Sequence, residues 1–490
     1  MTRRAIVGVS AVALPLIGLF AAFGPDARPN GDVSWYLLAA ERWLAGGRYG
    51  TEILEVNPPL AILLPVPSVL VARAIGIDPS VAHVLWTMAL VGASAALAAP
   101  SLARLLPGPT ALQAAALACY AVAVGAVPGH EIGQRDHHSI ILALPYLLAA
   151  AAGDLTRPGI RPAILIAVAA VGVLVKPYFI LLPALVLLAL WPGAGSRRGI
   201  LLARHVLWFG LPGAAFGGLV LVAFPEWLDV VRLALGTYRG YDAPGAVLAW
   251  AVAKRLAVAI AVAALAWCAW PPGWRARIAA VHLAGVAAYV GAAAMQGKSF
   301  DNHFDPPDVL NTLATLLALL RLAADGRAAV ATQERRRRMG AAALAAVLPL
   351  YALQQESRAA AQIEPRASAL DGPLAVRLSA LPRGTPVLLV STGLHGFPLV
   401  PMLGLRWGSA GPCYWMLPGI AQRLAAGERG PAIEALSSRQ RALFLDDIRR
   451  FRPALIGVRR APHPGGPPLD PLDFLRADRA VARALEAYVP

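Results

Sequence analysis

The sequence predicts a polytopic α-helical membrane protein that ends in a small α/β domain. Of the 490 residues, 58% are hydrophobic and only 15% are charged. The apolar residues gather in runs of about 20, the length that crosses a bilayer as a helix. After residue 354 these runs stop. The composition therefore divides the chain into a membrane domain, residues 1–354, and a soluble domain, residues 355–490.

Eleven apolar runs, several of them short, predict membrane-spanning helices. They lie near residues 5–23, 80–100, 110–128, 138–152, 162–175, 177–192, 200–223, 249–270, 277–295, 307–323 and 339–354. The first run follows Arg3 and Arg4, and we interpret it as an uncleaved signal anchor. Segment 58–75 is also apolar, but prolines open and interrupt it. Because a proline inside a helix removes a backbone hydrogen bond, we predict an interfacial or re-entrant helix there.

The arginines set the orientation of these helices. The net charge is +16. If segment 58–75 does not span, nearly all arginine clusters between the apolar runs fall on one side, which the positive-inside rule assigns to the cytoplasm. Lys254 and Arg255 are exceptions near the outer end of a helix. We therefore predict a multi-pass protein of the cell inner membrane, with a cytoplasmic N-terminus and a periplasmic C-terminal domain. A nucleic-acid partner is not expected, because no basic stripe is interleaved with aromatic residues.

Four polar loops face outward on this topology, and the acidic residues of the membrane domain concentrate in them. The loops are residues 24–79, 129–137, 224–248 and 296–306. This clustering predicts an outward-facing polar site.

Asp32, in the first loop, is the first candidate catalytic residue. It precedes an amphipathic helix predicted over Val33–Leu44. As the N-cap of that helix, its carboxylate would be kept ionised by the helix N-terminus. The simpler interpretation is an N-cap aspartate with no further role.

The second loop gathers ionisable groups next to a helix start. Asp136 is the second candidate catalytic residue, and Glu131, Arg135 and His137 are candidate substrate ligands. The alternative is a solvated turn at the membrane surface in which Arg135 pairs with Glu131. His137 and His138 are adjacent and cannot face one point on a helix, so a two-histidine metal site is not expected.

Further candidates for binding a substrate phosphate lie near two other outer turns. Lys176 is expected at a turn, because helices seldom continue through the residue before a proline. Lys298, Asp301 and His303 lie in the fourth loop, where a cation or an imidazole could bind phosphate. The alternatives are snorkelling of Lys176 to the headgroups and a solvated fourth loop.

The third loop is predicted to form an amphipathic helix at the membrane surface, with Trp227, Tyr238 and Tyr241 at headgroup depth. Its arginines, Arg232 and Arg239, either contact phosphate or balance nearby acids.

No metal centre or disulfide framework is evident in the sequence. Cys119, Cys268 and Cys413 are far apart and show no metal-ligand spacing. No cofactor is certain, and a divalent metal that joins Asp32, Asp136 and one histidine stays open.

The soluble domain shows the alternation of an α/β fold. Strands are predicted at residues 386–392 and 454–460, and helices at 431–450 and 472–487. No glycine-rich phosphate loop or nucleophile elbow is visible, so nucleotide-dependent chemistry is not expected. Three aromatic residues either face the membrane or the site, or form an ordinary core: Trp407, Tyr414 and Trp415.

Several short motifs resemble the GT-C superfamily of membrane glycosyltransferases, most closely the branch of protein O-mannosyltransferases and lipid A aminoarabinose transferases. An acid in a long first outer loop precedes an aromatic-rich helix, a G-x-Y turn at Gly47 and Tyr49 and an N-P-P-L element at residues 57–60. A second acid follows after two more spans. The resemblance covers roughly residues 1–200. By this likeness Asp32 corresponds to the first-loop catalytic aspartate and Asp136 to the second-loop acid.

The resemblance implies transfer of a sugar from a polyprenyl-phosphate-linked donor to a lipid, glycan or protein acceptor on the outer face. A carboxylate would deprotonate or orient the acceptor, and cations or an imidazolium would stabilise the leaving phosphate. Asp32 suits the first role, and Arg135, Lys176, Lys298 and His303 suit the second. Val33 stands where many members carry a second acid.

The alternative is a polytopic transporter or lipid flippase. A transporter would place ionisable residues near the middle of its helices and show an internal inverted repeat. Here the ionisable residues gather at one side of the membrane and no repeat is evident, which favours the enzyme. The same interpretation predicts that Asp32 and Asp136 face one outward cavity.

Overall fold

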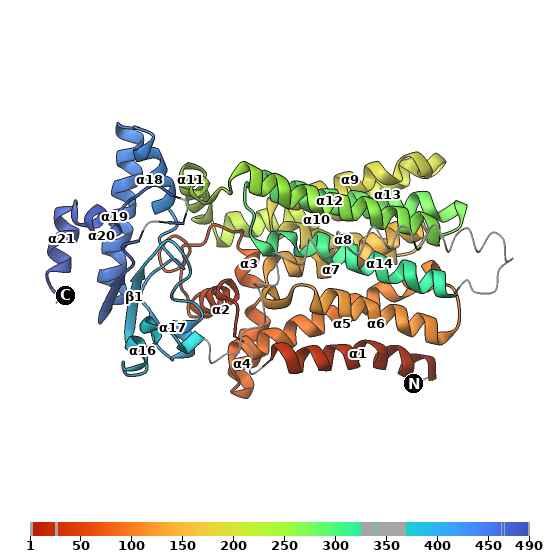
Figure 1. Cartoon of the computed structure of the whole chain (residues 1–490), viewed down its shortest axis with the longest axis horizontal. Coiled ribbons are helices and arrows are strands. Elements are labelled where there is room, and N and C mark those ends of the chain that lie inside the picture. The colour runs from red at the N-terminus through yellow and green to blue at the C-terminus, as the bar shows by residue number, and fades with distance from the viewer. Residues whose placement is uncertain are drawn as a thin grey trace. The chain divides into compact units, whose positions relative to one another are not determined.

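The computed structural model shows a mostly helical protein whose chain forms two compact units (Figure 1). It describes residues 3–24, 28–324, 341, 369–461, 463, 464 and 466–488. The helical unit comprises Met1–Pro25, Val81–Gly218 and Ala243–Ile363. The α/β unit comprises Asp26–Ser80, Leu219–Asp242 and Glu364–Pro490.

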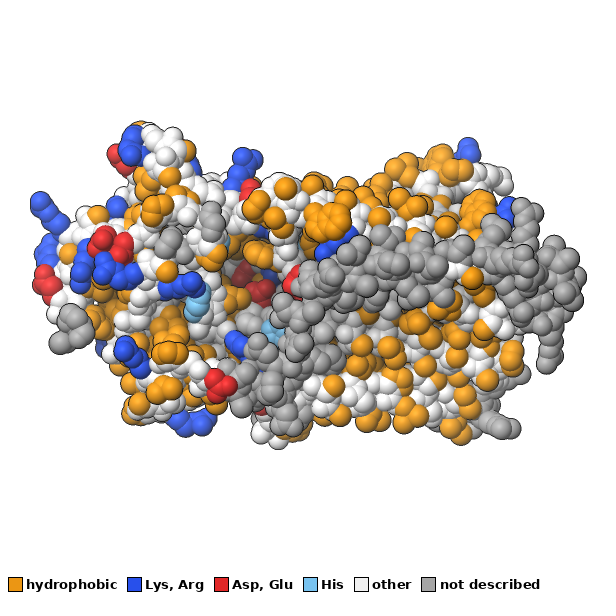
Figure 2. Space-filling view, viewed as in Figure 1, with side chains coloured by type: hydrophobic (Ala, Val, Ile, Leu, Met, Phe, Trp, Pro, Cys, Tyr) orange, Lys and Arg blue, Asp and Glu red, His pale blue; other side chains and the backbone are white. Residues whose placement is uncertain are grey.

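Within the part of the chain that is described, six helical segments are long and apolar enough to cross a membrane. They are Ala5–Ala22, Pro79–Leu105, Pro192–Ala223, Gly245–Ala269, Pro272–Gln296 and Asp301–Ala324. Figure 2 shows hydrophobic side chains spread over the outer surface of the helical unit, and Leu14, Ile17, Val206 and Leu211 are among the exposed ones. Apolar side chains exposed over so much of a surface are typical of contact with lipid. The membrane character predicted from composition is therefore supported.

The elements of the helical unit follow the predicted apolar runs. In chain order they are α1 (Arg3–Phe23), α5 (Pro79–Leu105), α6 (Thr110–Ala126), η1 (Gly129–Glu131), α7 (Arg135–Ala152), α8 (Arg161–Leu174), η2 (Pro177–Ile180), α9 (Leu181–Leu190), η3 (Pro192–Arg197), α10 (Arg198–Ala223), α12 (Gly245–Ala269), α13 (Pro272–Gln296), η5 (Asp301–Phe304) and α14 (Asp305–Ala324). Ten of the eleven predicted runs coincide with helices in this series. The eleventh, residues 339–354, lies outside the described residues, and the number of spans stays a prediction.

Helix α7 is enclosed by its neighbours along its whole length. All of its residues except Leu142 are buried. Helix α8 packs closely against it at Gly172, where a Cβ atom would lie 2.8 Å from the Ser139 carbonyl oxygen. Small residues allow this close approach between membrane helices. The polar residues at the start of α7 are therefore held inside the protein.

The α/β unit combines the C-terminal segment with the first and third loops. Its elements are α2 (Gly31–Leu44), α3 (Leu60–Leu63), α4 (Val66–Ile75), α11 (Trp227–Thr237), η4 (Tyr238–Tyr241), α16 (Pro373–Ser379), β1 (Pro386–Val390), α17 (Leu399–Met402), β2 (Arg406–Trp407), α18 (Leu417–Ala425), α19 (Pro431–Phe451), β3 (Leu455–Val458), α20 (Pro471–Arg476) and α21 (Arg479–Leu485). Residues 26–80 and 219–242 pack with residues 364–490. The composition of the sequence does not predict this association.

The sheet of the α/β unit has three parallel strands in the order β2-β1-β3. The two strands and the first helix predicted from the sequence are confirmed as β1, β3 and α19. The helix predicted over 472–487 is two helices, because the Asp478 side chain accepts hydrogen bonds from Ala480 and Val481 and starts α21 anew. Strand β2, two residues long, was not predicted. For the three aromatic residues with two alternative interpretations, the ordinary core is confirmed, because all three are buried: Trp407, Tyr414 and Trp415.

Segment 58–75 forms the two short helices α3 and α4, which both pack against α2. Helix α4 has 10 residues, or about 15 Å at the α-helical rise. That is half the thickness of a bilayer core, so neither helix spans by itself. Whether the segment lies in the membrane interface stays a prediction.

Candidate functional site

The start of α7 holds a buried aspartate. Asp136 lies in the first turn of the helix, where the N-terminal dipole favours a negative charge. Its side chain has no exposed surface. Lys176 Nζ lies 2.6 Å from Asp136 Oδ2, and Asn302 Nδ2 donates to the same oxygen at 3.1 Å. From the described residues, the other oxygen, Oδ1, accepts no hydrogen bond. Two donors therefore hold Oδ2, whereas none of the described residues donates to Oδ1.

Lys176 reaches Asp136 because of the break between α8 and η2. Helix α8 ends at Leu174, Lys176 takes an extended conformation, and Pro177 opens the next turn. The predicted break before the proline is confirmed. Lys176 is only 3% exposed, so the alternative of a side chain that snorkels to the headgroups is wrong.

The fourth loop adds further buried polar groups to this region. Lys298, Asn302 and His303 are buried, and Asp301 is partly exposed. The charges of Arg135, Lys176 and Lys298 all act on the His303 ring, which also forms a hydrogen bond with the Lys298 backbone. The alternative of a solvated loop is wrong for these buried residues. Three cations from three segments therefore converge around one imidazole.

Several ionisable groups are buried in this region. It contains three buried cations, Arg135, Lys176 and Lys298, and two buried carboxylates, Asp136 and Asp305. Buried charges are costly unless they are compensated. Lysine and arginine donate strong hydrogen bonds to anionic groups such as phosphate.

The histidine of the second loop has a structural environment. The Gly133 N–H donates to His137 Nδ1 at 3.0 Å, and His137 Nε2 lies 2.7 Å from the Val124 carbonyl oxygen. Both ring nitrogens are thus occupied by backbone groups. Glu131 accepts a hydrogen bond from Gln134. Because Asp136 and His137 are fully buried, the alternative of a solvated surface turn is wrong for this part of the loop.

The N-cap assigned to Asp32 was wrong. Helix α2 begins at Gly31, and the cap is Asn30, whose side chain accepts hydrogen bonds from the backbone of Asp32 and Val33. Asn30 takes the extended conformation that a cap requires, and Asp32 falls in the first turn. The helix N-terminus still favours its negative charge there. Asn30, and not Asp32, therefore caps the helix.

A buried glutamate near Asp32 was not singled out from the sequence. Glu55 is 3% exposed and accepts hydrogen bonds from Trp35 Nε1 at 2.7 Å and from the Asn57 backbone at 2.8 Å. The charges of Asp32 and Glu55 both act on the Cys413 thiol, and burial together with these charges raises its pKa to about 12. The signal available in the sequence was a glutamate two residues before the N-P-P-L element.

The third loop is engaged in packing within the α/β unit. Trp227 Nε1 donates to the Val56 carbonyl at 3.1 Å, and Tyr241 donates to the Thr392 carbonyl. Arg232 forms an ion pair with Asp229. The aromatic residues therefore serve the unit's interior contacts, and Arg232 follows the charge-balancing interpretation.

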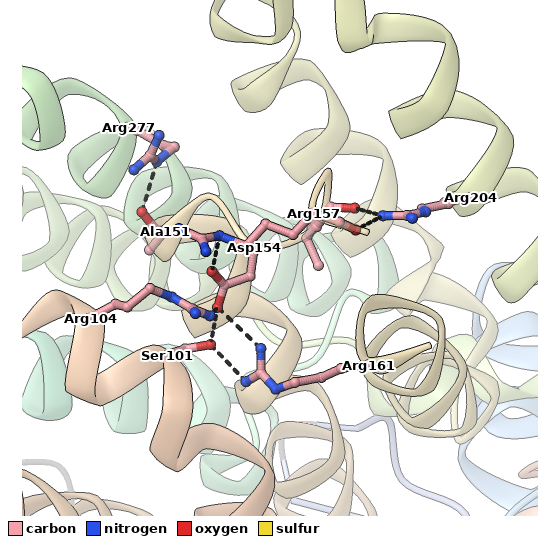
Figure 3. Close-up of polar contacts among 9 residues, drawn as sticks. Ser101, Arg104, Ala151, Asp154, Arg157, Arg161, Arg204 and Arg277 are labelled. Carbon is pink, nitrogen blue, oxygen red and sulfur yellow. Dashed lines mark hydrogen bonds and ion pairs between the residues drawn. The ribbon is translucent and has the colours of Figure 1, made fainter. Parts of the chain in front are cut away.

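A second buried carboxylate lies just beyond the opposite end of α7 (Figure 3). Asp154 Oδ2 accepts hydrogen bonds from Ser101 at 2.6 Å, from Arg161 at 3.1 Å and from Arg104. Arg157 Nε lies 3.4 Å from the other oxygen. Two further arginines bond to backbone carbonyls near Asp154: Arg204 and Arg277. These arginines come from α5, α8, α10 and α13, so the cluster ties four helices to the end of α7.

Another buried ion pair was not predicted. Arg255, in α12, lies 3.3 Å from Asp308 of α14 and 3.9 Å above the Phe304 ring. The sequence placed Arg255 near an outer helix end only as an exception to the charge rule. Its partner is 53 residues away and no local pattern connects the two.

No metal centre is formed within the described residues: no group of three or more His, Cys, Asp or Glu side chains there could hold a metal ion. Asp32 and Asp136 belong to different units, and their pairing stays a prediction.

Comparisons with known proteins give no relative. No family model matches the chain, and neither a curated protein nor a solved structure matches it. The functional interpretation rests on the residues themselves.

Proposed function

We propose that this protein is a glycosyltransferase of the GT-C type, which transfers a sugar from a polyprenyl-phosphate-linked donor to a lipid, glycan or protein acceptor at the outer face of the inner membrane. The observation that carries the proposal is the Asp136 carboxylate, fixed at one oxygen by Lys176 and Asn302 and open at the other toward the described residues. A carboxylate held in this way can orient a hydroxyl group or accept its proton.

The cations around Asp136 support the second half of the reaction. Sugar transfer leaves negative charge on the polyprenyl phosphate, and preorganised donors in a dry site stabilise developing charge effectively. Arg135, Lys298 and His303 are buried close to one another. Asp32 is proposed as the base that activates the acceptor, because it lies in the first turn of α2, where the helix N-terminus favours its negative charge.

Loss of each aspartate tests the proposal. Purified protein in nanodiscs is given polyprenyl-phosphate-linked sugars, and consumption of the donor is measured. Asp32→Asn keeps the size of the side chain and removes the base, so transfer should fall ~10²-fold or more. Asp136→Asn should also weaken transfer. Asp229→Asn is the matched control, because Asp229 is an exposed acid in a surface ion pair. Near-full transfer by Asp32→Asn would sink the mechanism.

Orientation is tested independently of activity. The proposal places the C-terminal domain in the periplasm and the arginine run 335–338, which lies outside the described residues, in the cytoplasm. With the three native cysteines replaced by alanine, Arg439→Cys should react with an impermeant thiol reagent in intact cells and Arg337→Cys should not. The reverse pattern would contradict the non-spanning interpretation of segment 58–75.

One observation favours the alternative of a transporter or flippase. Arg255 and Asp308 are buried, and Arg255 lies near the middle of α12, where charged residues often mark a transport path. Counterflow of labelled lipid-linked sugar in proteoliposomes distinguishes the two functions. Movement without chemical turnover, abolished by Arg255→Met, would favour transport over transfer.

A further inference from the structure

The strand order of the α/β unit creates a ligand-binding edge. Strand β1 lies between β2 and β3, and all three run parallel. The chain leaves β1 toward β2 on one side and later returns to β3 on the other. In open parallel sheets, ligands bind beyond the carboxyl ends of the strands where the connections diverge in this way. Here that place lies after Val390 of β1 and Val458 of β3.

Polar side chains occupy this edge. Ser391, Thr392 and His395 follow β1 directly, and Arg459 follows β3. The Arg459 backbone N–H donates to the Val390 carbonyl at 2.9 Å, which places the two segments side by side. The Arg459 guanidinium contacts His395 Nε2. These contacts join the two strand ends through a cation and an imidazole.

A second histidine completes the group. His463 Nδ1 lies 3.2 Å from Thr392 Oγ1, and its ring packs against Tyr241 with a centroid separation of 4.7 Å. A hollow beside these residues is lined by Thr392, His463, Leu417, Pro418 and Leu469. The edge therefore combines a hydroxyl group, two imidazoles and a guanidinium beside a concave surface.

The charges at this edge are of one sign. Burial, and then the positive charge of Arg459, lower the pKa of both His395 and His463. No carboxylate of the described residues is among the charges that act on either ring. The neighbouring Arg460 is different, because it forms ion pairs with Asp470 at 2.6 Å and with Asp473 at 3.9 Å. Of two adjacent arginines, one is matched with carboxylates and the other faces histidines.

We propose that the carboxyl edge of the sheet, between β1 and β3, binds a phosphate group through Arg459, His395 and the Thr392–His463 pair. The charge of Arg459 disfavours protonation of the two imidazoles. A bound phosphate would offset that charge, and guanidinium and imidazolium could then both donate to it. The ligand is a phosphomonoester or a diphosphate. This inference does not depend on sugar transfer, since no residue of the Asp136 cluster takes part.

Calorimetric titration with inorganic pyrophosphate tests the site, using the full chain in nanodiscs of phosphatidylcholine at low salt. The wild-type protein should bind with a millimolar or lower dissociation constant. Arg459→Ala should weaken binding about 10-fold or more, as expected for loss of a charge-assisted donor, and Arg459→Lys should recover part of it. Arg460→Ala is the matched control and should change binding less than about twofold, because that charge is already paired. Thermal unfolding of each variant checks that the fold is kept.

The source of the phosphate is separated by a competition arm. Vesicles that contain phosphatidic acid should displace pyrophosphate if the ligand is a lipid headgroup, and they should not displace it if the ligand is a soluble phosphate compound. Vesicles of phosphatidylcholine serve as the control. Either result is consistent with a phosphate site. Absence of saturable binding to the wild type, or an equal loss in Arg460→Ala and Arg459→Ala, would overturn the proposal.

Discussion

Helix α7 has a buried aspartate at each end, and the surroundings of the two carboxylates differ. Asp136 has one lysine and one asparagine on a single oxygen. Asp154 has three arginines and a serine distributed over both oxygens. The two side chains are equally hidden, at 0% and 1% exposure. Burial alone therefore does not separate a functional carboxylate from a structural one.

The positive charge around them does separate them. Asp154 is over-compensated, and its neighbours come from four helices besides α7, so its contribution is to hold those helices together. In both carboxylates Oδ1 accepts no hydrogen bond from the described residues. Arg157 Nε nevertheless lies 3.4 Å from Asp154 Oδ1, whereas the ion pair of Asp136 with Lys176 is made at Oδ2. A buried carboxylate paired with one lysine keeps more of its charge for an incoming group than one surrounded by three arginines.

Removal of the Asp154 carboxylate should have the largest effect on stability. Asp154→Ala leaves Arg104, Arg157 and Arg161 facing one another without a counter-charge. Loss of one partner from a buried ionic network costs about 3–5 kcal/mol. We expect a large drop in the thermal unfolding temperature of the purified protein in detergent, or a loss of folded protein in the membrane. An unfolding temperature equal to that of the wild type would contradict the structural role.

Removal of the Asp136 carboxylate should destabilise the protein less, and a second substitution should recover part of the lost stability. Asp136→Asn leaves Lys176 buried beside a neutral amide, at a cost of about 2–3 kcal/mol. The double variant Asp136→Asn, Lys176→Met removes the stranded charge and should recover at least half of the lost unfolding temperature. Sugar transfer should not recover. If the double variant is no more stable than the single one, Lys176 is not the principal partner of Asp136.

The sequence predicted a functional residue at one end of α7, Asp136, but not the arginine cluster around Asp154 at the other end. The apolar runs and the break before Pro177 are local features of the sequence. Both were confirmed, in α7 and at the end of α8. Asp136 was selected because an ionisable residue at membrane depth is unusual. The arginines around Asp154 were used only for orientation, since the positive-inside rule explains them without a partner. Their convergence on one carboxylate depends on contacts between helices.

The errors in the α/β unit have three different causes. The capping motif shifted by two residues because Asn30 and Asp32 are both good N-cap residues, and the choice between them depends on where the chain enters the helix. Glu55 lies outside any helix and accepts a hydrogen bond from Trp35 of α2, 20 residues away. No periodic pattern predicts such a contact. Strand β2 has two residues, too few for an alternating pattern to be recognised.

A third buried aspartate, in the α/β unit, extends the comparison to a carboxylate held mainly by neutral donors. Asp447 accepts hydrogen bonds from the Ala410 backbone and the Tyr414 hydroxyl, both at 2.9 Å. Burial raises the pKa of Asp447 to about 6. The folded state therefore holds a proton that the unfolded state has lost, so stability decreases as the pH rises through this value. The decrease should be about 1 kcal/mol between pH 5 and pH 7.

Hydrogen exchange of α19 and β1 amides across this pH interval measures the effect. The variant Asp447→Asn keeps the side-chain shape and cannot ionise, so the pH dependence of protection should disappear once the intrinsic exchange rate is corrected. Asp446→Asn is the neighbouring control. A wild-type protection that rises with pH in this interval would show that hydrogen-bond donors outweigh burial at Asp447.

The smallest expected effect concerns the most exposed member of the Asp154 cluster. The Arg157 side chain is 55% exposed, and its Nε lies 3.4 Å from Asp154 Oδ1, beyond a short hydrogen bond. The backbone carbonyl of Arg157, which accepts from Arg204 at 2.7 Å, is unaffected by a change of side chain. Because exposed ion pairs contribute little, Arg157→Ala should cost about 0.5 kcal/mol or less, and the cost should vanish at high salt. Arg161→Ala, which also loses hydrogen bonds to Ser101 and the Leu97 carbonyl, should cost several times more in the same thermal unfolding assay. Equal costs for the two variants would mean that the cluster acts through its net charge and not through the individual contacts that hold the helices around Asp154.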